Sequence, residues 1–354
     1  MPAPRPTQVT ILGLPEAVHS TVAGLADVFG IFGLLRDLDR SASPDPPFRV
    51  TIAGPRCADS SALPFRVTRT IDQVGYSDVV VVPALMVDAN AWRPGRHPDA
   101  VEWLRRMHRR GATVCSTCSG ALLLAETGLL DGREATTHWA YAEVFRRWFP
   151  AVHLRLEHLL VVAGERGELM MSGANGSWHD LALHLISQRI GAAAALGVAR
   201  FLLLEWHRDG QMPYVPFQPP RDHGDGLILP AQDWLERHFD APNPVEEAMR
   251  RTGLPMRTFN RRFLKATGTT AIKYVQRCRV EAAKRRLEAD SHPIDEIARC
   301  VGYEDPAFFR RLFKRTTGIT PGAYRRKLQL PAVHRSPAHA EQGRGVLTTR
   351  SADR

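Results

Sequence analysis

Two patterns of hydrophobic and polar positions divide the chain. Between residue 7 and about residue 190, short apolar and β-branched runs alternate with segments whose apolar residues recur at helical spacing. The run within 77–85 is apolar almost throughout, which is typical of a strand buried on both faces of a sheet. This alternation predicts a mainly parallel sheet with helices on both faces. We expect strands within 8–14, 48–54, 77–85, 112–116 and 168–173, and helices within 98–111, 119–128 and 176–191.

The pattern changes after residues 211–226, which are rich in Pro and Gly and are typical of an interdomain linker. From 227 to 328 every periodic segment has helical spacing. We therefore expect an α/β domain over 1–210, an all-helical domain over 227–328 and a disordered polar tail over 329–354.

The helical region contains a near-repeat at a separation of 50 residues. The matching pairs are Phe263 and Phe313, Thr267 and Thr317, Gly268 and Gly318, and Thr270 and Thr320. Each copy has a helical segment, a turn at Gly253 or Gly302, and a second helical segment. Two copies are too few for a solenoid, so the pattern predicts two helix-turn-helix units.

The second helix of each unit is predicted to have one apolar and one cationic face. The apolar faces are expected at Met256, Phe259 and Phe263, and at Phe309, Leu312 and Phe313. The outward faces are expected at Arg257, Arg261 and Lys265, and at Ala307, Arg310, Arg311 and Lys314. Helix starts are expected at Asn243 with Pro244 and at Asp305 with Pro306.

The two units are joined by residues 270–290, which contain no Gly or Pro. A helix of roughly 20 residues is about 30 Å long. Major-groove faces on one side of B-DNA recur about every 34 Å. A connector of this length can therefore place two recognition helices in adjacent major grooves.

The net charge of +10 is unevenly placed. Residues 226–330 carry 21 Lys and Arg against 12 Asp and Glu, whereas residues 1–225 carry 22 against 23. Charge alone fits a nucleic-acid surface and a solvated basic face equally well. The duplicated helix-turn-helix pattern and the matching connector favour DNA binding over a plain helical bundle.

Residues 226–328 resemble the DNA-binding domain of the AraC/XylS family of bacterial transcription regulators. The resemblance rests on "RTFNRRFLKATG", "RVEAAKRRLE" and "IDEIARCVGYEDPAFFRRLFKRTTGITPGAYRR", in which "ITPGAYRR" is a strong marker. By position it implies base-edge contacts from Arg257, Thr258, Asn260, Arg261, Pro306, Ala307, Arg310 and Arg311. Lys265, Lys314 and Arg315 are expected at phosphates. Because Pro306 and Ala307 cannot donate side-chain hydrogen bonds, the second unit is expected to read DNA more by shape and phosphate.

The stretch "ATVCSTCSGALLLAE", residues 112–126, places Cys115 and Cys118 in a C-x-x-C spacing. It predicts a strand, a tight turn at Cys118 and a helix, with Gly120 two residues later, which is the geometry of a nucleophile elbow. The helix N-terminus there can lower the pKa of a thiol. Cys115 lies on the strand, so a buried structural thiol is favoured over a redox pair.

The remaining chemistry predicts neither a metal site nor a cofactor. Zinc needs about four ligands, and no second C-x-x-C or close histidine pair supplies them. His179 and His184 are five positions apart and diverge on a helix. The cysteines number five, at 57, 115, 118, 278 and 300, an odd count without a regular framework that indicates free thiols in a reducing cytoplasm.

Residues 7–195 resemble the ThiJ/PfpI family of class I glutamine-amidotransferase-like domains, and the branch closest to them is the GlxA-like regulators. The matching motifs are "VVVVPAL", "CSGALLLAETGLLDGREATTHW" and "MSGANGSWHDLALHLI". The resemblance implies a flavodoxin-like parallel sheet. It also implies that Cys118 takes the elbow position and that His138 approaches the same pocket, as in a nucleophile–base pair.

Three positions depart from the catalytic pattern of that family. Ser119 stands where the proteases have histidine, and Thr21 stands where a glutamate is often aimed at the cysteine. Ala84 and Leu85 replace a glycine pair that offers backbone N–H groups to an oxyanion. The departures favour a ligand pocket over catalysis. Its expected residues are Cys118, His138, Ser119, Thr21, Ala84, Leu85 and Asn175.

Together these features predict a cytoplasmic transcription regulator that binds double-stranded promoter DNA. The N-terminal domain is expected to form a homodimer and to sense a small-molecule effector, which by resemblance is an amino acid or a quaternary amine. A cysteine-dependent amidase or protease-like hydrolase, and a thiol redox sensor using Cys118, remain alternatives. No apolar run is long enough for a membrane span, and the N-terminal segment lacks the pattern of a signal peptide.

Overall fold

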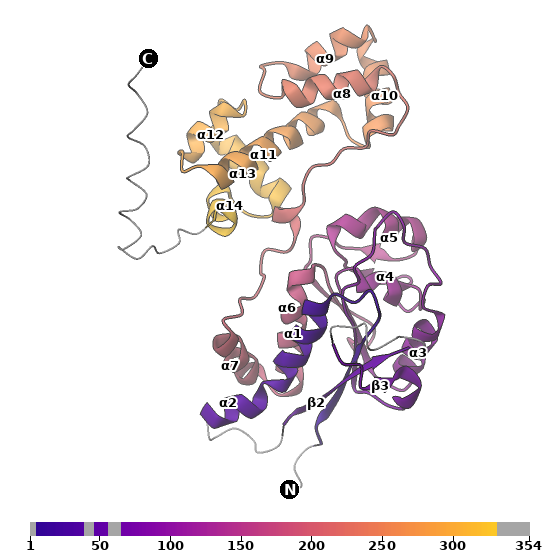
Figure 1. The fold of residues 1–354 in the computed structure, drawn as a ribbon. Coiled ribbons are helices and arrows are strands. Elements are labelled where there is room, and N and C mark those ends of the chain that lie inside the picture. The colour runs from indigo at the N-terminus through magenta and orange to yellow at the C-terminus, as the bar shows by residue number, and fades with distance from the viewer. Residues whose placement is uncertain (1–4, 39–45, 56–64, 331–354) are drawn as a thin grey trace, which may run out of the picture. The chain divides into compact units, whose positions relative to one another are not determined.

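The computed structural model describes residues 5–38, 46–55 and 65–330. The chain divides into two compact units, Met1–Val215 and Pro216–Arg354 (Figure 1). Cys57 and the predicted tail beyond residue 330 lie outside the described residues.

The first unit is built on a sheet of seven strands in the order β3-β2-β1-β4-β5-β9-β8. The strands are β1 (Thr7–Leu12), β2 (Phe48–Gly54), β3 (Arg69–Thr70), β4 (Val79–Val82), β5 (Thr113–Thr117), β8 (Leu160–Ala163) and β9 (Leu169–Ser172). All neighbouring pairs are parallel except β8 with β9. The central order β2-β1-β4-β5-β9 is the flavodoxin-like order, so the predicted fold class is confirmed.

Helices cover both faces of this sheet, with α1 and α6 packed together on one face and α3 on the other (Figure 1). The helices are α1 (His19–Gly30), α2 (Phe32–Leu38), α3 (Pro98–Arg109), α4 (Gly120–Ala125), α5 (Ala142–Trp148), α6 (Trp178–Arg189) and α7 (Ala192–Leu202). The short elements are η2 (Ile71–Gln73), β6 (Glu134–Ala135), η3 (Trp139–Tyr141), β7 (His153–Leu154), η4 (Asn175–Ser177) and η5 (Met212–Tyr214).

Burial explains why the central strands lack an alternating pattern. Every residue of β4, β5 and β9 is buried. A strand covered on both faces has no solvent side, so polar and apolar positions do not alternate: β4 is all valine, while β5 and β9 also carry buried Thr and Ser. Because these three strands are parallel, their carboxyl ends meet at one edge of the sheet, the edge at which open α/β sheets bind ligands.

The second unit is all helical over its described residues. Its helices are α8 (Ile228–Arg237), α9 (Pro244–Thr252), α10 (Met256–Thr267), α11 (Ala271–Ala289), α12 (Ile294–Cys300), α13 (Pro306–Thr317) and α14 (Pro321–Leu328). The predicted connector is α11, whose 19 residues make it about 29 Å long. Two cores share α11, one packed with α8–α10 and the other with α12–α14.

The predicted duplication is confirmed by equivalent packing in the two cores. Phe263 meets Tyr274 edge to face with ring centroids 5.3 Å apart, and Phe313 meets Tyr324 at 5.4 Å. The hydroxyls of the paired threonines donate to the carbonyls of the paired phenylalanines at 2.8 and 2.9 Å. The helix ends at Gly253, Gly268 and Gly318 are all left-handed.

Two local predictions need correction. Met256 is predicted on the buried face of the second helix, but its side chain is 65% exposed. It is the first residue of α10, where it lines an open groove with Val245 and Ile272, and the buried face begins only at Phe259. Asn243 occupies the expected cap position of α9 without a side-chain capping bond.

The cap of α13 forms as predicted. The Asp305 side chain accepts a hydrogen bond from the Ala307 N–H at 2.8 Å, and Pro306 begins the helix.

Candidate functional site

Cys118 follows the last residue of β5 and directly precedes the capping residue of α4. Its φ of 52° lies in the left-handed region, which side chains other than glycine seldom adopt. Its N–H donates to the carbonyl of Ser172 at 2.7 Å. A Cβ at Gly120 would lie 2.4 Å from the carbonyl oxygen of Pro83, so the helix can start this close to β4 only with glycine. The predicted tight turn is thus confirmed.

The Cys118 thiol is not activated by this turn. Burial raises the pKa of Cys118 to about 11, and hydrogen bonds with Ser119 and with the backbone of Asn175 lower it only in part. The lowered pKa that a helix N-terminus can produce does not occur, because desolvation of a side chain that is only 6% exposed outweighs it. At neutral pH Cys118 is therefore a neutral thiol.

Thr21 and Asn175 meet beside this thiol. Thr21 lies fully buried in α1, and its hydroxyl donates to the Asn175 side-chain oxygen at 2.7 Å. The backbone of Asn175 in turn hydrogen-bonds Cys118. The structure therefore brings together three of the residues that the sequence places in one pocket.

The Ser119 side chain forms two hydrogen bonds with the backbone of Leu85. Its hydroxyl accepts from the Leu85 N–H at 2.8 Å and donates to the Leu85 carbonyl at 2.7 Å. The carbonyl of Ala84 accepts from the Val18 N–H at 2.7 Å. The Leu85 N–H is thus used inside the protein, whereas a donor to an oxyanion must be free to point at the reacting atom.

His138 is half-buried and is bound to its own turn. Its Nδ1 accepts from the Ala140 N–H at 3.1 Å, and its ring centroid is 4.9 Å from that of Trp139. Burial lowers the pKa of His138 and raises that of Cys118, so it favours the neutral form of both side chains. The residues therefore do not form the thiolate–imidazolium pair of an activated nucleophile.

Tyr141 is a neighbour of Cys118 that no motif in the sequence marks. Its hydroxyl donates to the Val87 carbonyl at 2.8 Å. Burial raises the pKa of Tyr141, the nearby Cys118 raises it further, and a hydrogen bond with Ser119 lowers it. The ring centroids of His138 and Tyr141 are 6.3 Å apart. The turn that carries both rings is therefore linked to Cys118 by Tyr141.

The second helices of the duplicated units, α10 and α13, carry the residues expected to meet DNA. The exposed ones are Arg257, Asn260, Arg261, Lys265, Ala307, Arg310, Arg311, Lys314 and Arg315, and the half-buried ones are Thr258 and Pro306. Among the described residues, Arg257, Arg261 and Lys265 of α10 form no ion pair, whereas Arg262 of the same helix pairs with Asp225 at 2.7 Å. On α13, Arg310 pairs with Asp295 and Arg311 lies 3.9 Å from Asp305. Exposed pairs of this kind contribute little, so phosphate can replace the carboxylates.

Known proteins resemble both halves of the chain. A family model described as a helix-turn-helix domain matches residues 249–327, and the DJ-1/PfpI family matches residues 42–167. The HTH-type transcriptional regulator GlxA of Rhizobium meliloti is 30% identical over 228 residues, which cover 63% of this chain and 68% of that protein. The chain belongs to the AraC-type transcriptional regulators with a DJ-1/PfpI domain.

Two further proteins are similar to this regulator. The HTH-type transcriptional regulator CdhR of Pseudomonas aeruginosa is 29% identical over 258 residues, which cover 70% of this chain and 75% of that protein. The crystal structure of Drosophila melanogaster DJ-1beta superposes with a TM-score of 0.46 at 20% identity and covers 57% of this chain and 100% of that chain. As a member of its family, the regulator binds DNA with the helix-turn-helix region and carries a sensing domain. Among its described helices, none has the length and apolar content to cross a membrane.

Proposed function

We propose that this cytoplasmic regulator binds double-stranded promoter DNA sequence-specifically with both helix-turn-helix units, under the control of a small-molecule effector held beside Cys118. The observation that carries the proposal is the pair of equivalent units joined by the single helix α11. At about 29 Å, α11 approaches the roughly 34 Å repeat of the major groove.

The two recognition helices divide the readout differently. On α10, Arg257 and Arg261 are suited to guanine and Asn260 to adenine, because their side chains can form bidentate hydrogen bonds with base edges. On α13, Pro306 and Ala307 leave the first turn without side-chain donors, so this helix contributes shape and phosphate contacts more than base-edge contacts. Thr258, Arg310 and Arg311 complete the base-facing set, and Lys265, Lys314 and Arg315 bind phosphates.

A binding experiment tests this division. Fluorescence anisotropy with the upstream region of the regulator's own operon, at graded salt, should show binding well above that to scrambled DNA. Arg261→Ala should relax the preference at one base pair by about 1–3 kcal/mol, whereas Lys265→Ala should weaken all sequences alike. Absence of specific binding, with and without candidate effectors, would refute the proposal.

The effector pocket is supported by polar groups around the elbow. The buried hydroxyls of Thr117 and Ser172 find no hydrogen-bond partner among the described residues, and the two residues pair across β5 and β9 next to Cys118. Buried hydroxyls are nearly always hydrogen-bonded, so they suit a polar ligand. The rings of His138, Trp139 and Tyr141 are close to one another, and aromatic groups bind quaternary ammonium ions. Amino acids or quaternary amines are therefore the effector class that we propose.

A thermal-shift screen of such metabolites tests the pocket, because a ligand that binds the folded state raises its apparent stability. Thr21→Val, which breaks the bond to Asn175, should abolish the shift that the effector produces. Cys300→Ser, at an exposed position of the second unit, is the control and should show the same effector-induced thermal shift as the parent. An equal shift in both variants would place the effector elsewhere.

We further propose that the regulator is not an enzyme. The raised pKa of Cys118, the lowered pKa of His138 and the occupied Leu85 N–H all oppose acyl transfer. The same high pKa opposes direct peroxide sensing, which needs an accessible thiolate. Turnover of amide or dipeptide substrates by the full-length chain that disappears in Cys118→Ala would overturn this part.

We also propose a homodimer formed through the first unit. Its helix α7 and the residue after it expose Leu196, Phe201 and Leu203, and exposed apolar side chains of this kind are typical of interfaces. Leu203→Asp should convert a dimer to a monomer in sedimentation. An unchanged sedimentation coefficient would exclude this surface.

A further inference from the structure

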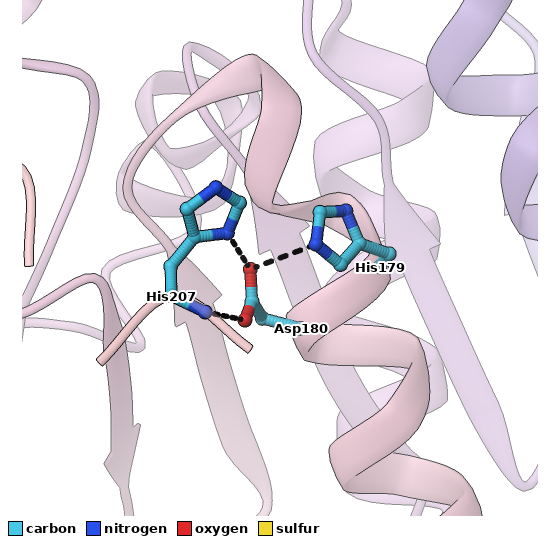
Figure 2. A group of neighbouring side chains, drawn as sticks. All are labelled: His179, Asp180 and His207. Atoms are coloured by element: carbon cyan, nitrogen blue, oxygen red, sulfur yellow. Dashed lines mark hydrogen bonds and ion pairs between the residues drawn. The ribbon is translucent and has the colours of Figure 1, made fainter. Parts of the chain in front are cut away.

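A group of metal-binding side chains lies at the start of α6, away from the elbow chemistry (Figure 2). His179 and Asp180 are the second and third residues of this helix, and His207 comes from the segment that follows α7. Sequence spacing pairs His179 with His184, and on that pairing no metal site is predicted. The structure instead pairs His179 with His207, 28 residues away, and places donor atoms of the three side chains within 4.8 Å of one another.

We propose that His179, Asp180 and His207 bind a divalent transition-metal ion of the zinc type. Two imidazoles and one carboxylate are a donor set that zinc and its neighbours in the first transition series favour, with the fourth position open. A fourth protein donor is close, because the carbonyl oxygen of Glu205 lies 3.0 Å from Nε2 of His179.

The distances fit an ion after small side-chain rotations. Zinc bonds of about 2.0–2.2 Å put two donors of a tetrahedral ion roughly 3.3 Å apart. His207 Nδ1 is 2.7 Å and His179 Nε2 is 3.6 Å from the same carboxylate oxygen, Asp180 Oδ2. One separation is shorter and the other longer than the ion requires, so a small outward turn of the His207 ring and a small inward turn of the His179 ring satisfy both.

Burial gives the site an interior and an entrance. The Asp180 side chain is 5% exposed, and a carboxylate so far from water is stabilised by a cation or by several donors. The His207 side chain is 32% exposed, which leaves a path for an ion and for a water ligand. The two rings lie side by side with centroids 5.0 Å apart, and both direct a nitrogen at Asp180 (Figure 2).

The backbone holds this arrangement in place before any ion binds. Leu203 has a φ of 53°, so the chain turns sharply after α7 and returns His207 to α6. The His207 N–H then donates to the second oxygen of Asp180, Oδ1, at 2.9 Å. This backbone bond occupies Oδ1 and leaves Oδ2 to the imidazoles. A metal ion that binds Oδ2 and the two rings therefore has to displace only protons on the ring nitrogens.

Direct titration of the full-length, untagged Cys300→Ser protein tests the proposal, since this background removes the exposed thiol as a competing ligand. After treatment with a chelator, Co²⁺ should bind at one equivalent with visible d–d absorption, and Zn²⁺ should displace it. His179→Gln and His207→Gln should each weaken binding by at least about tenfold. His184→Gln, on the same helix outside the group, should leave it unchanged.

The outcomes separate a metal site from a hydrogen-bonded clamp. His179→Gln leaves both bonds between Asp180 and His207 in place, so its circular dichroism should match that of the parent. Stoichiometric binding that is lost in this folded variant supports the site. Absence of stoichiometric binding in the parent, or equal affinity in the His179→Gln and His184→Gln variants, overturns it and leaves a clamp without metal.

Discussion

Arg279 in the middle of α11 ties the two helix-turn-helix units together. Its Nε donates to the Phe239 carbonyl at 2.6 Å, and its two terminal nitrogens donate to Gly302 at 2.7 Å and to Ala241 at 3.0 Å. The guanidinium also lies 4.9 Å from the centre of the Tyr303 ring. One side chain therefore fixes the turn between α8 and α9 and the turn between α12 and α13 against the same helix.

Removal of this side chain should loosen both turns. Arg279→Ala deletes three hydrogen bonds, and a net value of about 1 kcal/mol for each makes the expected loss of local stability about 3 kcal/mol. At 1.4 kcal/mol for each factor of ten, the two bonds lost from the turn between α8 and α9 should raise its open population about 30-fold, and the one bond lost from the turn between α12 and α13 should raise its open population about fivefold.

Hydrogen exchange measured by mass spectrometry on the full-length protein can resolve this effect, because it reports local opening. In Arg279→Ala, peptides that cover 238–244 should exchange about 30-fold faster and peptides that cover 301–305 about fivefold faster. Arg285→Ala is the matched control, since Arg285 is exposed on the same helix. If both variants exchange alike in the two turns, Arg279 does not join the units. If only one turn responds, the side chain stabilises a single unit.

Two predictions concern the elbow of the first unit. Because the folded protein keeps Cys118 protonated, alkylation of this thiol should be slow at neutral pH and rise as the pH approaches about 11, while exposed Cys300 reacts early. Peptide mass spectrometry over a pH series checks this, and equal rates at neutral pH would contradict it. Gly120→Ala places a Cβ 2.4 Å from the Pro83 carbonyl and should cost at least about 1–3 kcal/mol, seen as a lower melting temperature of the first unit. An unchanged melting temperature would show that α4 can shift.

The elements that a local pattern specifies could be predicted from the sequence. The valines of β4 form an unbroken apolar run because neither face of the strand meets water. Gly253 and Gly268 end their helices in the left-handed conformation, for which glycine has no steric cost. The 50-residue repeat identified the second core because the same residue types recur at the same positions.

Features that depend on long-range contacts could not be predicted in this way. Met256 has the spacing of a core residue, yet whether it is covered depends on which elements reach the first turn of α10. The His179–His207 pairing depends on the reversal of the chain at Leu203. No glycine stands at this position to mark the turn in the sequence. The raised pKa of Cys118 depends on how deeply several elements bury the thiol, whereas the sequence shows only the helix that follows it.

The elbow separates the positioning of a cysteine from its activation. Its strained backbone is held from two sides, since the Cys118 N–H donates to Ser172 and the Cys118 carbonyl accepts from the Thr137 hydroxyl at 2.8 Å. Ser119→Ala would free the Leu85 N–H for an oxyanion. The same change would remove the Ser119 side-chain hydrogen bond, which is one of those that lower the pKa of Cys118, so the thiol should become still harder to ionise. If alkylation of the Ser119→Ala variant begins at a lower pH than in the parent, this reasoning is refuted. The variant would then gain a free N–H for an oxyanion and ionise Cys118 more easily at the same time.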